Sequence, residues 1–168
     1  MRLFFALWPD AAARDAFAVL AQELALRSGG KPVPPAKIHL TVAFLGDLGE
    51  DRLEAARRAA EGGGWKAFDV TLDQVGSFRG ARVGWAGCRE PAPGLIELQS
   101  GLSGRLVEAG FALDDRPYAA HVTLARKIVR PIPTSPSEPV TWRASELALV
   151  RSELGRGSYS TLAEWRLG

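Results

Sequence analysis

The feature that most constrains this chain is a short phrase that occurs twice, about half the chain apart. His39 opens His-Leu-Thr-Val-Ala and His121 opens His-Val-Thr-Leu-Ala, and these are the only two histidines among the 168 residues. In an extended strand, alternate side chains share a face. Each phrase therefore predicts a strand that points one imidazole and one hydroxyl to one side and its aliphatic residues into a core.

The phrase belongs to a larger internal repeat. A strand-like segment at 2–6 precedes a helical pattern and then His39, and a second such segment at 82–86 precedes another helical pattern and then His121. Self-similarity at this scale predicts a duplicated lobe. A pseudo-two-fold axis would bring the two histidine strands together in a cleft. We expect a single domain over residues 1–168, because neither unit is large enough to be stable alone.

Hydrophobic periodicity predicts alternating helices and strands along the chain. The expected strands cover Leu3–Trp8, Ile38–Leu45, Phe68–Asp73, Arg82–Ala86, Ala119–Ile128, Val140–Arg151 and Ser158–Arg166, the last two joined around Gly155–Gly157. The expected helices run from an Asp10 cap to Gly29, over Glu50–Glu61, and from Leu95 to near Gly110. The proline-rich segments Lys31–Lys37 and Pro131–Pro139 are expected to be loops.

Composition places the chain among ordinary globular proteins and narrows its setting. Apolar residues make up 46% and charged residues 24%, and the longest apolar run, near Leu3–Trp8, is far too short to span a membrane. A single cysteine, Cys88, excludes an internal disulfide and predicts a reducing cytoplasm. Most basic residues are arginine, which suits phosphate, but a net charge of +2 supports nucleic-acid binding only weakly. No interface signature stands out, so we expect a monomer.

The paired histidines predict acid–base chemistry on a phosphate ester. In-line attack on a phosphodiester needs a base at the nucleophile and an acid at the leaving oxygen, and two imidazoles supply both. The hydroxyls of Thr41 and Thr123 and a nearby arginine would stabilise charge on the non-bridging oxygens. A zinc site would need at least one more ligand, and there is no third histidine or second cysteine, so we expect no metal and no cofactor. The simpler alternative is two half-buried strands that each happen to carry a histidine.

At these residues the chain resembles the 2H phosphoesterase superfamily, and within it the bacterial and archaeal RNA 2′,3′-cyclic phosphodiesterases, also called the LigT-like or 2′-5′ RNA ligase family. The phrases that carry the resemblance are Arg-Leu-Phe-Phe-Ala at 2–6, the two histidine motifs at 39–46 and 121–126, Arg-Val-Gly-Trp at 82–85 and Arg-Pro-Tyr at 116–118. The resemblance implies a bilobal α+β fold in which two antiparallel sheets line a central cleft with helices outside. It also implies metal-independent hydrolysis of RNA 2′,3′-cyclic phosphate ends to 2′-phosphates, with reversible 2′-5′ joining of RNA as a side reaction.

The resemblance further implies roles for single residues. His39 would protonate the leaving 3′ oxygen and His121 would activate water, although the nearly equivalent motifs do not by themselves separate the two roles. Thr41, Thr123 and Arg126 would hold the phosphate. Strict alternation, however, places Arg126 on the face opposite His121, so it reaches the cleft only if the strand ends or bulges there.

Aromatic residues near the motifs are candidates for stacking on a base. Tyr118 and Phe5 are the stacking candidates, with packing as the alternative for Tyr118. Phe5 and Phe44 are both expected mainly in the core, with an edge of either able to line the cleft.

Two other functions stay open. One is the same chemistry on a small cyclic nucleotide, an ADP-ribose cyclic phosphate or a 2′-5′ oligonucleotide, and the other is an RNA-end binding module without catalysis.

Overall fold

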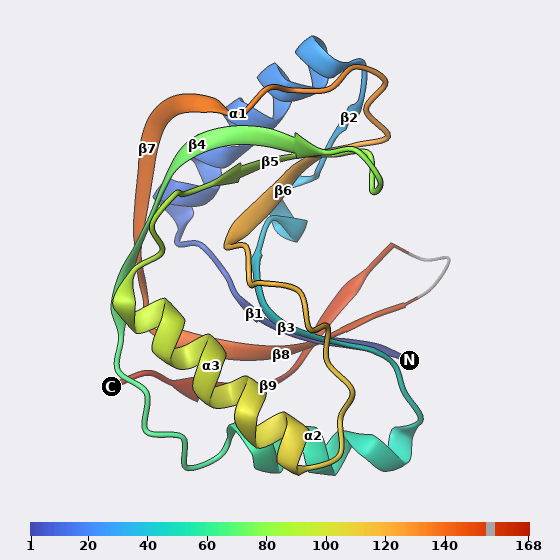
Figure 1. Ribbon diagram of the computed structural model, residues 1–168, viewed down its shortest axis with the longest axis vertical. Helices are drawn as coiled ribbons and strands as arrows, with labels where there is room; N and C mark the ends of the chain where they lie inside the picture. Colours follow the sequence, from blue (N-terminus) through green and yellow to red (C-terminus); the bar gives the residue numbers. More distant parts are fainter. Residues whose placement is uncertain (154–156) are drawn as a thin grey trace.

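One antiparallel sheet forms the framework of the computed structural model, which describes residues 1–153 and 157–168 (Figure 1). The strands in these ranges are β1 (Arg2–Leu7), β2 (Lys31–Pro32), β3 (Leu40–Asp47), β4 (Phe68–Phe78), β5 (Val83–Gly87), β6 (His121–Arg126), β7 (Ser135–Ala144), β8 (Glu146–Ser152) and β9 (Tyr159–Arg166). They pair in the order β7-β4-β5-β6-β3-β1-β8-β9, and the short β2 pairs with β6. The α+β class expected from the sequence is confirmed.

The sheet differs from the two separate sheets that were expected. Strands β3 and β6 pair through Leu40 and Val122, and this pairing joins the two halves into one sheet. In each half the strand with the histidine motif is innermost, with β1 beside β3 and β5 beside β6. The halves therefore have matching strand orders, but the hydrogen-bonded ladder runs through both because the histidine strands meet directly.

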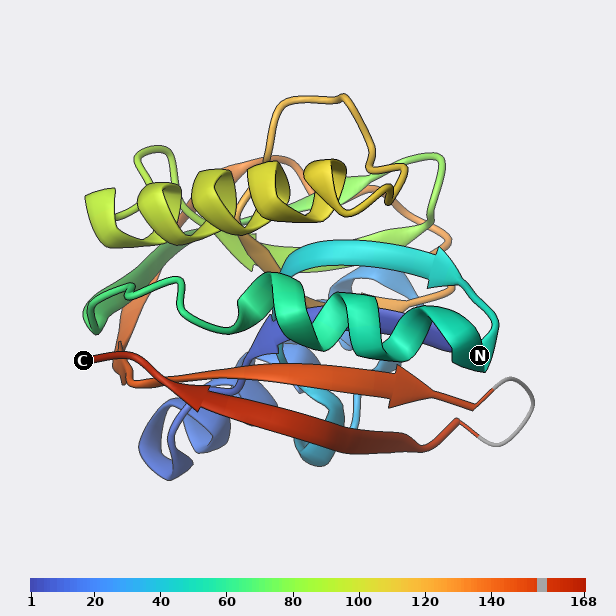
Figure 2. The same ribbon diagram turned by 90° about the horizontal axis from the view of Figure 1, so that it is seen from below.

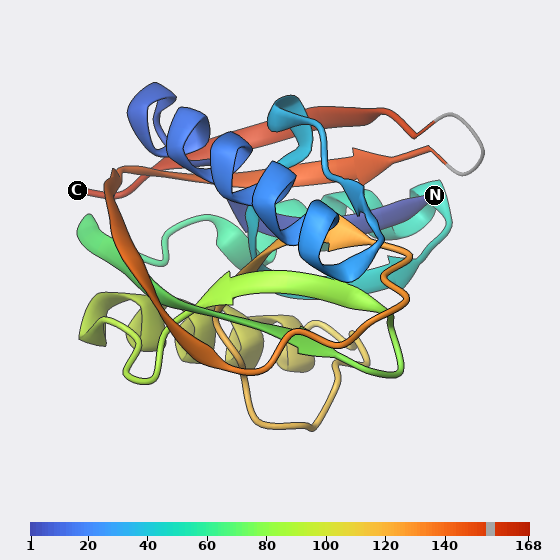
Figure 3. The same ribbon diagram turned by 90° about the horizontal axis from the view of Figure 1, so that it is seen from above.

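Helices cover the sheet from two sides. In the part of the chain that the structure describes they are α1 (Ala11–Ser28), α2 (Leu53–Ala60) and α3 (Pro93–Glu108). The view from below has α2 and α3 in front, and the view from above has α1 in front (Figures 2 and 3). None of these described helices is both long enough and apolar enough to cross a membrane.

The signals that predicted the two long helices correspond to physical contacts. The Asp10 side chain accepts a hydrogen bond of 2.8 Å from the amide of Ala13 and so caps the first turn of α1. Gly29 ends α1 in the left-handed conformation, with φ 73°. The leucine stripe of α3 is buried along its whole length, at Leu95, Leu98, Leu102 and Leu106. Both helices are therefore confirmed, each with one apolar face on the core.

Two expectations for the C-terminal third are wrong. The segment Pro131–Pro139 is not all loop, because β7 begins at Ser135, and prolines are tolerated there since β7 is an edge strand. The stretch Val140–Arg151 is not one strand. Strand β7 pairs with β4 at one edge of the sheet and ends at Ala144. The chain then passes to the other half, where β8 pairs with β1 from Ala148 onward.

Smaller differences concern element boundaries. The expected loop Lys31–Lys37 contains β2 and a 3-10 turn over Pro35–Lys37, because Lys31 and Pro32 pair with the end of β6. The helix expected over Glu50–Glu61 starts as a 3-10 turn before α2. The turn predicted around Gly155–Gly157 lies mostly outside the described residues.

Candidate active site

Both histidine motifs contain the same irregularity. The register of β3 against β1 shifts at Val42, and the register of β6 against β5 shifts at Leu124. These are the second aliphatic residues of the two motifs, and such a bulge inverts the alternation of side chains beyond it. The residues that follow the motifs, Phe44 and Arg126, therefore lie on the same face as the histidines and line the same pocket. The bulge resolves the difficulty that alternation posed for Arg126.

His39 lies immediately before β3 in a partly buried aromatic setting. Its ring stacks on Phe4 with centroids 4.8 Å apart, and the rings of Trp8 and Tyr159 meet it edge-on at 5.5 and 5.4 Å. The Nδ1 atom donates a hydrogen bond of 2.7 Å to the carbonyl oxygen of Lys37. This bond fixes the tautomer and leaves Nε2 as the nitrogen available to the pocket.

His121 opens β6 and is held in the same way. Its Nδ1 atom donates a hydrogen bond of 2.7 Å to the carbonyl oxygen of Ala119, two residues earlier. The carbonyl oxygen of Lys37, two residues before His39, accepts the equivalent bond in the other motif. The ring of Phe78 meets the imidazole edge-on at 5.1 Å. The two imidazoles thus have equivalent tautomers, set by the backbone rather than by a carboxylate.

The electrostatic setting of the two imidazoles is also similar. Burial lowers the pKa of His39 and of His121 below the usual value, while the backbone hydrogen bond raises each. The positive charges of Arg126 and His121 lower the pKa of His39 further. Because both pKa values move in the same direction, they do not separate the acid from the base.

The two histidines share one pocket of about 240 Å³. Its described lining comprises Arg2, Phe4, His39, Thr41, Phe44, His121, Thr123, Arg126, Ser152 and Tyr159. All residues expected to do acid–base chemistry or to hold phosphate are therefore brought together. None of the described lining residues is acidic, so the pocket presents positive charge and hydroxyl donors to an anion.

The two stacking candidates lie outside this pocket. Phe5 is completely buried, with its ring 5.9 Å from that of Trp165, so the stacking role expected for it is wrong. Tyr118 packs against the core and its hydroxyl donates a hydrogen bond of 2.8 Å to the carbonyl oxygen of Thr41. Burial raises the pKa of this hydroxyl. Tyr118 therefore holds the β3 backbone beside His39 instead of presenting its ring to a ligand.

Several lining residues were not predicted as site residues. Phe44 is 53% exposed, against the mainly core position expected, because the bulge at Val42 turns it toward the pocket. Phe4 lines the pocket where Phe5 was expected, on the same face of β1 as Arg2. Ser152 and Tyr159 lie at the ends of β8 and β9 and carry no motif that links them to the histidines.

The fold and the pocket together define a class of protein. The family model described as the 2′-5′ RNA ligase superfamily matches residues 8–156. The chain belongs to this superfamily, and the resemblance inferred from the histidine motifs is confirmed.

Individual relatives are similar over nearly the full chain. The RNA 2′,3′-cyclic phosphodiesterase of Escherichia coli (strain K12) is 32% identical, over 99% of this chain and 96% of that protein. The protein of the same name from Thermus thermophilus is 34% identical, over 92% of this chain and 83% of that protein. The crystal structure of E. coli LigT complexed with 3′-AMP matches with a TM-score of 0.87 at 30% identity, covering 99% of this chain and 97% of that one.

Proposed function

We propose that this protein is an RNA 2′,3′-cyclic phosphodiesterase that opens cyclic phosphate ends to 2′-phosphates without a metal. The observation that carries the proposal is a pair of histidines in one pocket, each with Nδ1 bonded to the carbonyl two residues earlier and Nε2 left for substrate. The names of its relatives, RNA 2′,3′-cyclic phosphodiesterase, support RNA as the substrate. Two imidazoles with no acidic residue in the described part of the lining fall short of the ligand set that a zinc site uses.

The proposed reaction is an in-line displacement at phosphorus. His121 accepts a proton from water at Nε2 as the water oxygen bonds to phosphorus, and the bond from phosphorus to the 3′ oxygen breaks. The imidazolium of His39 donates its Nε2 proton to that leaving oxygen, which gives a 2′-phosphate and a 3′-hydroxyl. When a 5′-hydroxyl replaces water as the nucleophile, the same steps join two strands through a 2′-5′ linkage.

The remaining polar residues of the pocket bind the phosphate in this proposal. The hydroxyls of Thr41 and Thr123 donate to the non-bridging oxygens, and Arg126 adds a charged donor that strengthens as negative charge develops. Arg2 lines the same pocket, and its buried Nε has no hydrogen-bond partner among the described residues. A phosphate oxygen would satisfy this donor.

Matching strand orders support the proposal that the two halves are duplicated lobes of a single domain, 1–168. Helix α1 follows β1 of one half yet packs against β6 of the other, and α3 packs against β3 as well as β4. Each half therefore depends on the other for part of its core, which supports one domain rather than two. We extend the proposal to a monomer in the cytoplasm, the compartment that the single Cys88 favours.

The test of the proposed function uses an oligoribonucleotide with a 2′,3′-cyclic phosphate end, incubated with the protein in excess EDTA. Phosphorus NMR of the product is expected to show a 2′-phosphate. A 3′-phosphate would reverse the leaving group and exchange the roles of His39 and His121. Binding of the RNA end without turnover would favour the non-catalytic module, and turnover of small cyclic nucleotides alone would favour the second substrate class.

Replacement of Phe44 by alanine is expected to raise KM for 2′,3′-cyclic AMP about tenfold, because stacking of a base on an aromatic ring contributes about 1–3 kcal/mol. The ring lines the pocket and is 53% exposed, so stability is expected to change little. Steady-state kinetics and urea unfolding measure the two effects. Val19→Ala, at an exposed apolar position on α1, is the matched control. An unchanged KM in F44A would place the base on another face of the pocket.

A further inference from the structure

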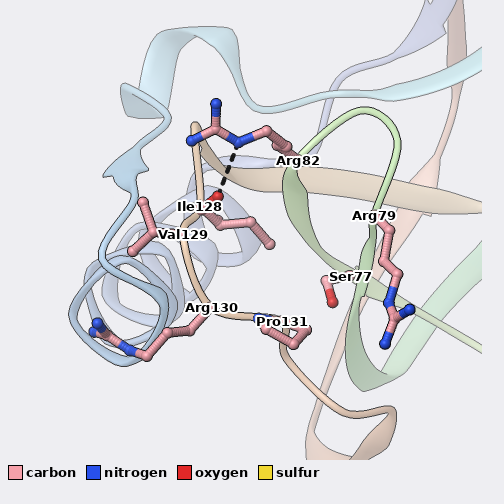
Figure 4. Close-up of a pocket in the computed structure, with 7 residues that line it drawn as sticks. All are labelled: Ser77, Arg79, Arg82, Ile128, Val129, Arg130 and Pro131. Atoms are coloured by element: carbon pink, nitrogen blue, oxygen red, sulfur yellow. Dashed lines mark hydrogen bonds between the residues drawn. The ribbon is translucent and has the colours of Figure 1, made fainter.

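A second and larger cavity, of about 490 Å³, opens where β6 ends. Figure 4 shows Arg79, Arg82 and Arg130 around it, between the turn that joins β4 to β5 and the segment that follows β6. We call the cavity with these three residues the arginine groove. All three arginines are exposed, so their guanidinium groups are accessible to a ligand from solvent.

Two of the three side chains of the arginine groove are fixed by hydrogen bonds to backbone carbonyls rather than by ion pairs. Arg82 donates from Nε to the carbonyl of Ile128 at 3.1 Å, and Arg130 donates from Nε to the carbonyl of Arg27 at 3.0 Å, at the C-terminal end of α1. The side chain of Arg79 makes no hydrogen bond or ion pair with any described residue, and only its backbone carbonyl is bonded, to the amide of Arg82. Because no carboxylate among the described residues neutralises the three guanidinium groups, each retains charge and free N–H donors for an anion.

The charge around the arginine groove follows from an uneven distribution along the chain. No aspartate or glutamate occurs in 24–46, 74–89 or 116–137, although these segments contain lysines and arginines. The sheet brings the three segments together, because β2 and β5 both pair with β6, and Arg126 lies opposite Lys31 on one side and Val83 on the other. A net charge of only +2 thus conceals a strongly basic surface at this end of the molecule.

The opposite end of the active-site pocket is different. There Arg2 lies 4.0 Å from Asp47, and Arg151 pairs with Glu50 and Glu153 at 3.4 and 2.7 Å. These carboxylates would repel a polyanion, and they offset part of the positive charge of the two arginines beside them. A nucleic-acid strand that leaves the pocket along β6 therefore meets arginines that no described carboxylate pairs.

Basic residues connect the pocket to the arginine groove without interruption. Arg126 lines the pocket and pairs with Val83 on the neighbouring strand, about 4.8 Å away. Arg82 directly precedes Val83, so Arg126 and Arg82 are separated by one strand spacing and one residue. Arg82 and Lys127 also have left-handed backbone conformations, each with φ 54°, which non-glycine residues seldom adopt. Two basic side chains are thus kept at this junction at some cost in backbone energy.

We propose that the arginine groove binds the phosphodiester backbone of the RNA strand on the 5′ side of the reacting end. The proposal rests on the proposed function, since it assumes that the cyclic phosphate sits between the two histidines. It predicts that the protein favours a cyclic-phosphate-ended oligoribonucleotide over a cyclic mononucleotide, because only the oligonucleotide reaches the groove.

Arg79→Glu tests this directly, because the side chain of Arg79 has no hydrogen-bond or ion-pair partner among the described residues. We expect KM for the oligonucleotide to rise about tenfold, as loss of a charge-assisted contact implies, while kcat and KM for 2′,3′-cyclic AMP stay unchanged. The neutral variant Arg79→Gln is expected to reduce the slope of log affinity against log salt by about 0.7, the value for one phosphate contact on a single strand. Arg14→Glu changes the net charge equally and serves as the control, because Arg14 lies on α1 about 20 Å from Arg27, the residue that Arg130 contacts.

A second measurement separates this proposal from the proposed function. Fluorescence anisotropy with a labelled, 2′-phosphate-ended oligoribonucleotide reports binding without turnover. Loss of affinity in R79E but not in R14E supports the arginine groove even if no hydrolysis occurs. Equal losses in both variants, equal wild-type affinity for mononucleotide and oligonucleotide, or a dependence of AMP or inorganic phosphate binding on Arg79 would overturn it, the last by identifying a site for free anions.

Discussion

Replacement of His39 or His121 by glutamine is expected to lower kcat on a cyclic-phosphate-ended RNA by about 10²–10⁴-fold, the usual contribution of a general acid or base. Each imidazole has Nδ1 committed to a backbone carbonyl, so Nε2 is the nitrogen left to move the proton. Steady-state and single-turnover kinetics measure the loss. The double variant is expected to lose less than the product of the single losses, because residues that act as a unit are not additive.

Folding must be separated from chemistry in these variants. His39 stacks on Phe4 and contacts Tyr159, so its replacement removes packing as well as a proton carrier. Urea unfolding of each variant therefore accompanies the kinetics, and a folded but inactive variant is the expected result. Near-wild-type turnover in both single variants would refute the two-histidine mechanism.

A substrate with a sulfur atom at the bridging 3′ position distinguishes the acid from the base. A thiolate leaves without needing a proton, so loss of the general acid is expected to matter much less on this substrate. If His39 is the acid, H39Q regains most of its deficit there and H121Q regains none. The reverse pattern would exchange the two roles.

The pH dependence of kcat/KM gives an independent view of the same pair. When the pKa of the base is lowered, the base stays neutral down to a lower pH. When the pKa of the acid is lowered, the acid loses its proton at a lower pH. Because burial lowers the pKa of both imidazoles, both limbs of the bell are expected to move to lower pH, with the maximum on the acidic side of about pH 6.5. Each single variant is expected to lose one limb.

The shared orientation of the histidine and threonine side chains could be predicted from sequence because it is encoded locally. A histidine and a threonine two residues apart share a face in any strand, and the repeat of the whole strand–helix–strand unit predicts that the two copies meet. Arg126 could be predicted only conditionally. Its orientation depends on the bulge at Leu124, and that bulge follows from packing, since Leu124 and Ala125 are both fully buried despite being neighbours in one strand.

The features that could not be predicted depend on tertiary position. Every residue of β1 from Leu3 to Leu7 is buried, because the strand lies inside the sheet with β3 and β8 on either side, so no alternation shows that Phe4 and not Phe5 faces the pocket. The prolines of β7 likewise indicate a loop until its edge position is known. Residue propensities and hydrophobic periodicity predict that a segment forms a strand, but they do not predict where that strand lies in the sheet.

Replacement of Arg126 by alanine is expected to lower kcat/KM by about 10²–10³-fold, the cost of removing one preorganised donor from a developing oxyanion. The guanidinium lines the pocket on the same face as His121 and Thr123 because of the bulge. Arg126→Lys keeps the charge but loses the bidentate geometry, so it is expected to recover only part of the rate. Full activity in R126A would exclude the residue from phosphate binding.

Arg126 also provides a way to assign the two limbs of the pH profile. After burial, its positive charge is one of the causes that lower the pKa of His39, whereas burial is the cause that lowers the pKa of His121. In R126A the pKa of His39 therefore rises, and the limb that His39 controls moves to higher pH while the other stays in place. If His39 donates the proton, the limb that moves is the alkaline one. Movement of the acidic limb would make His39 the base, and R126K, which retains the charge, is expected to move neither.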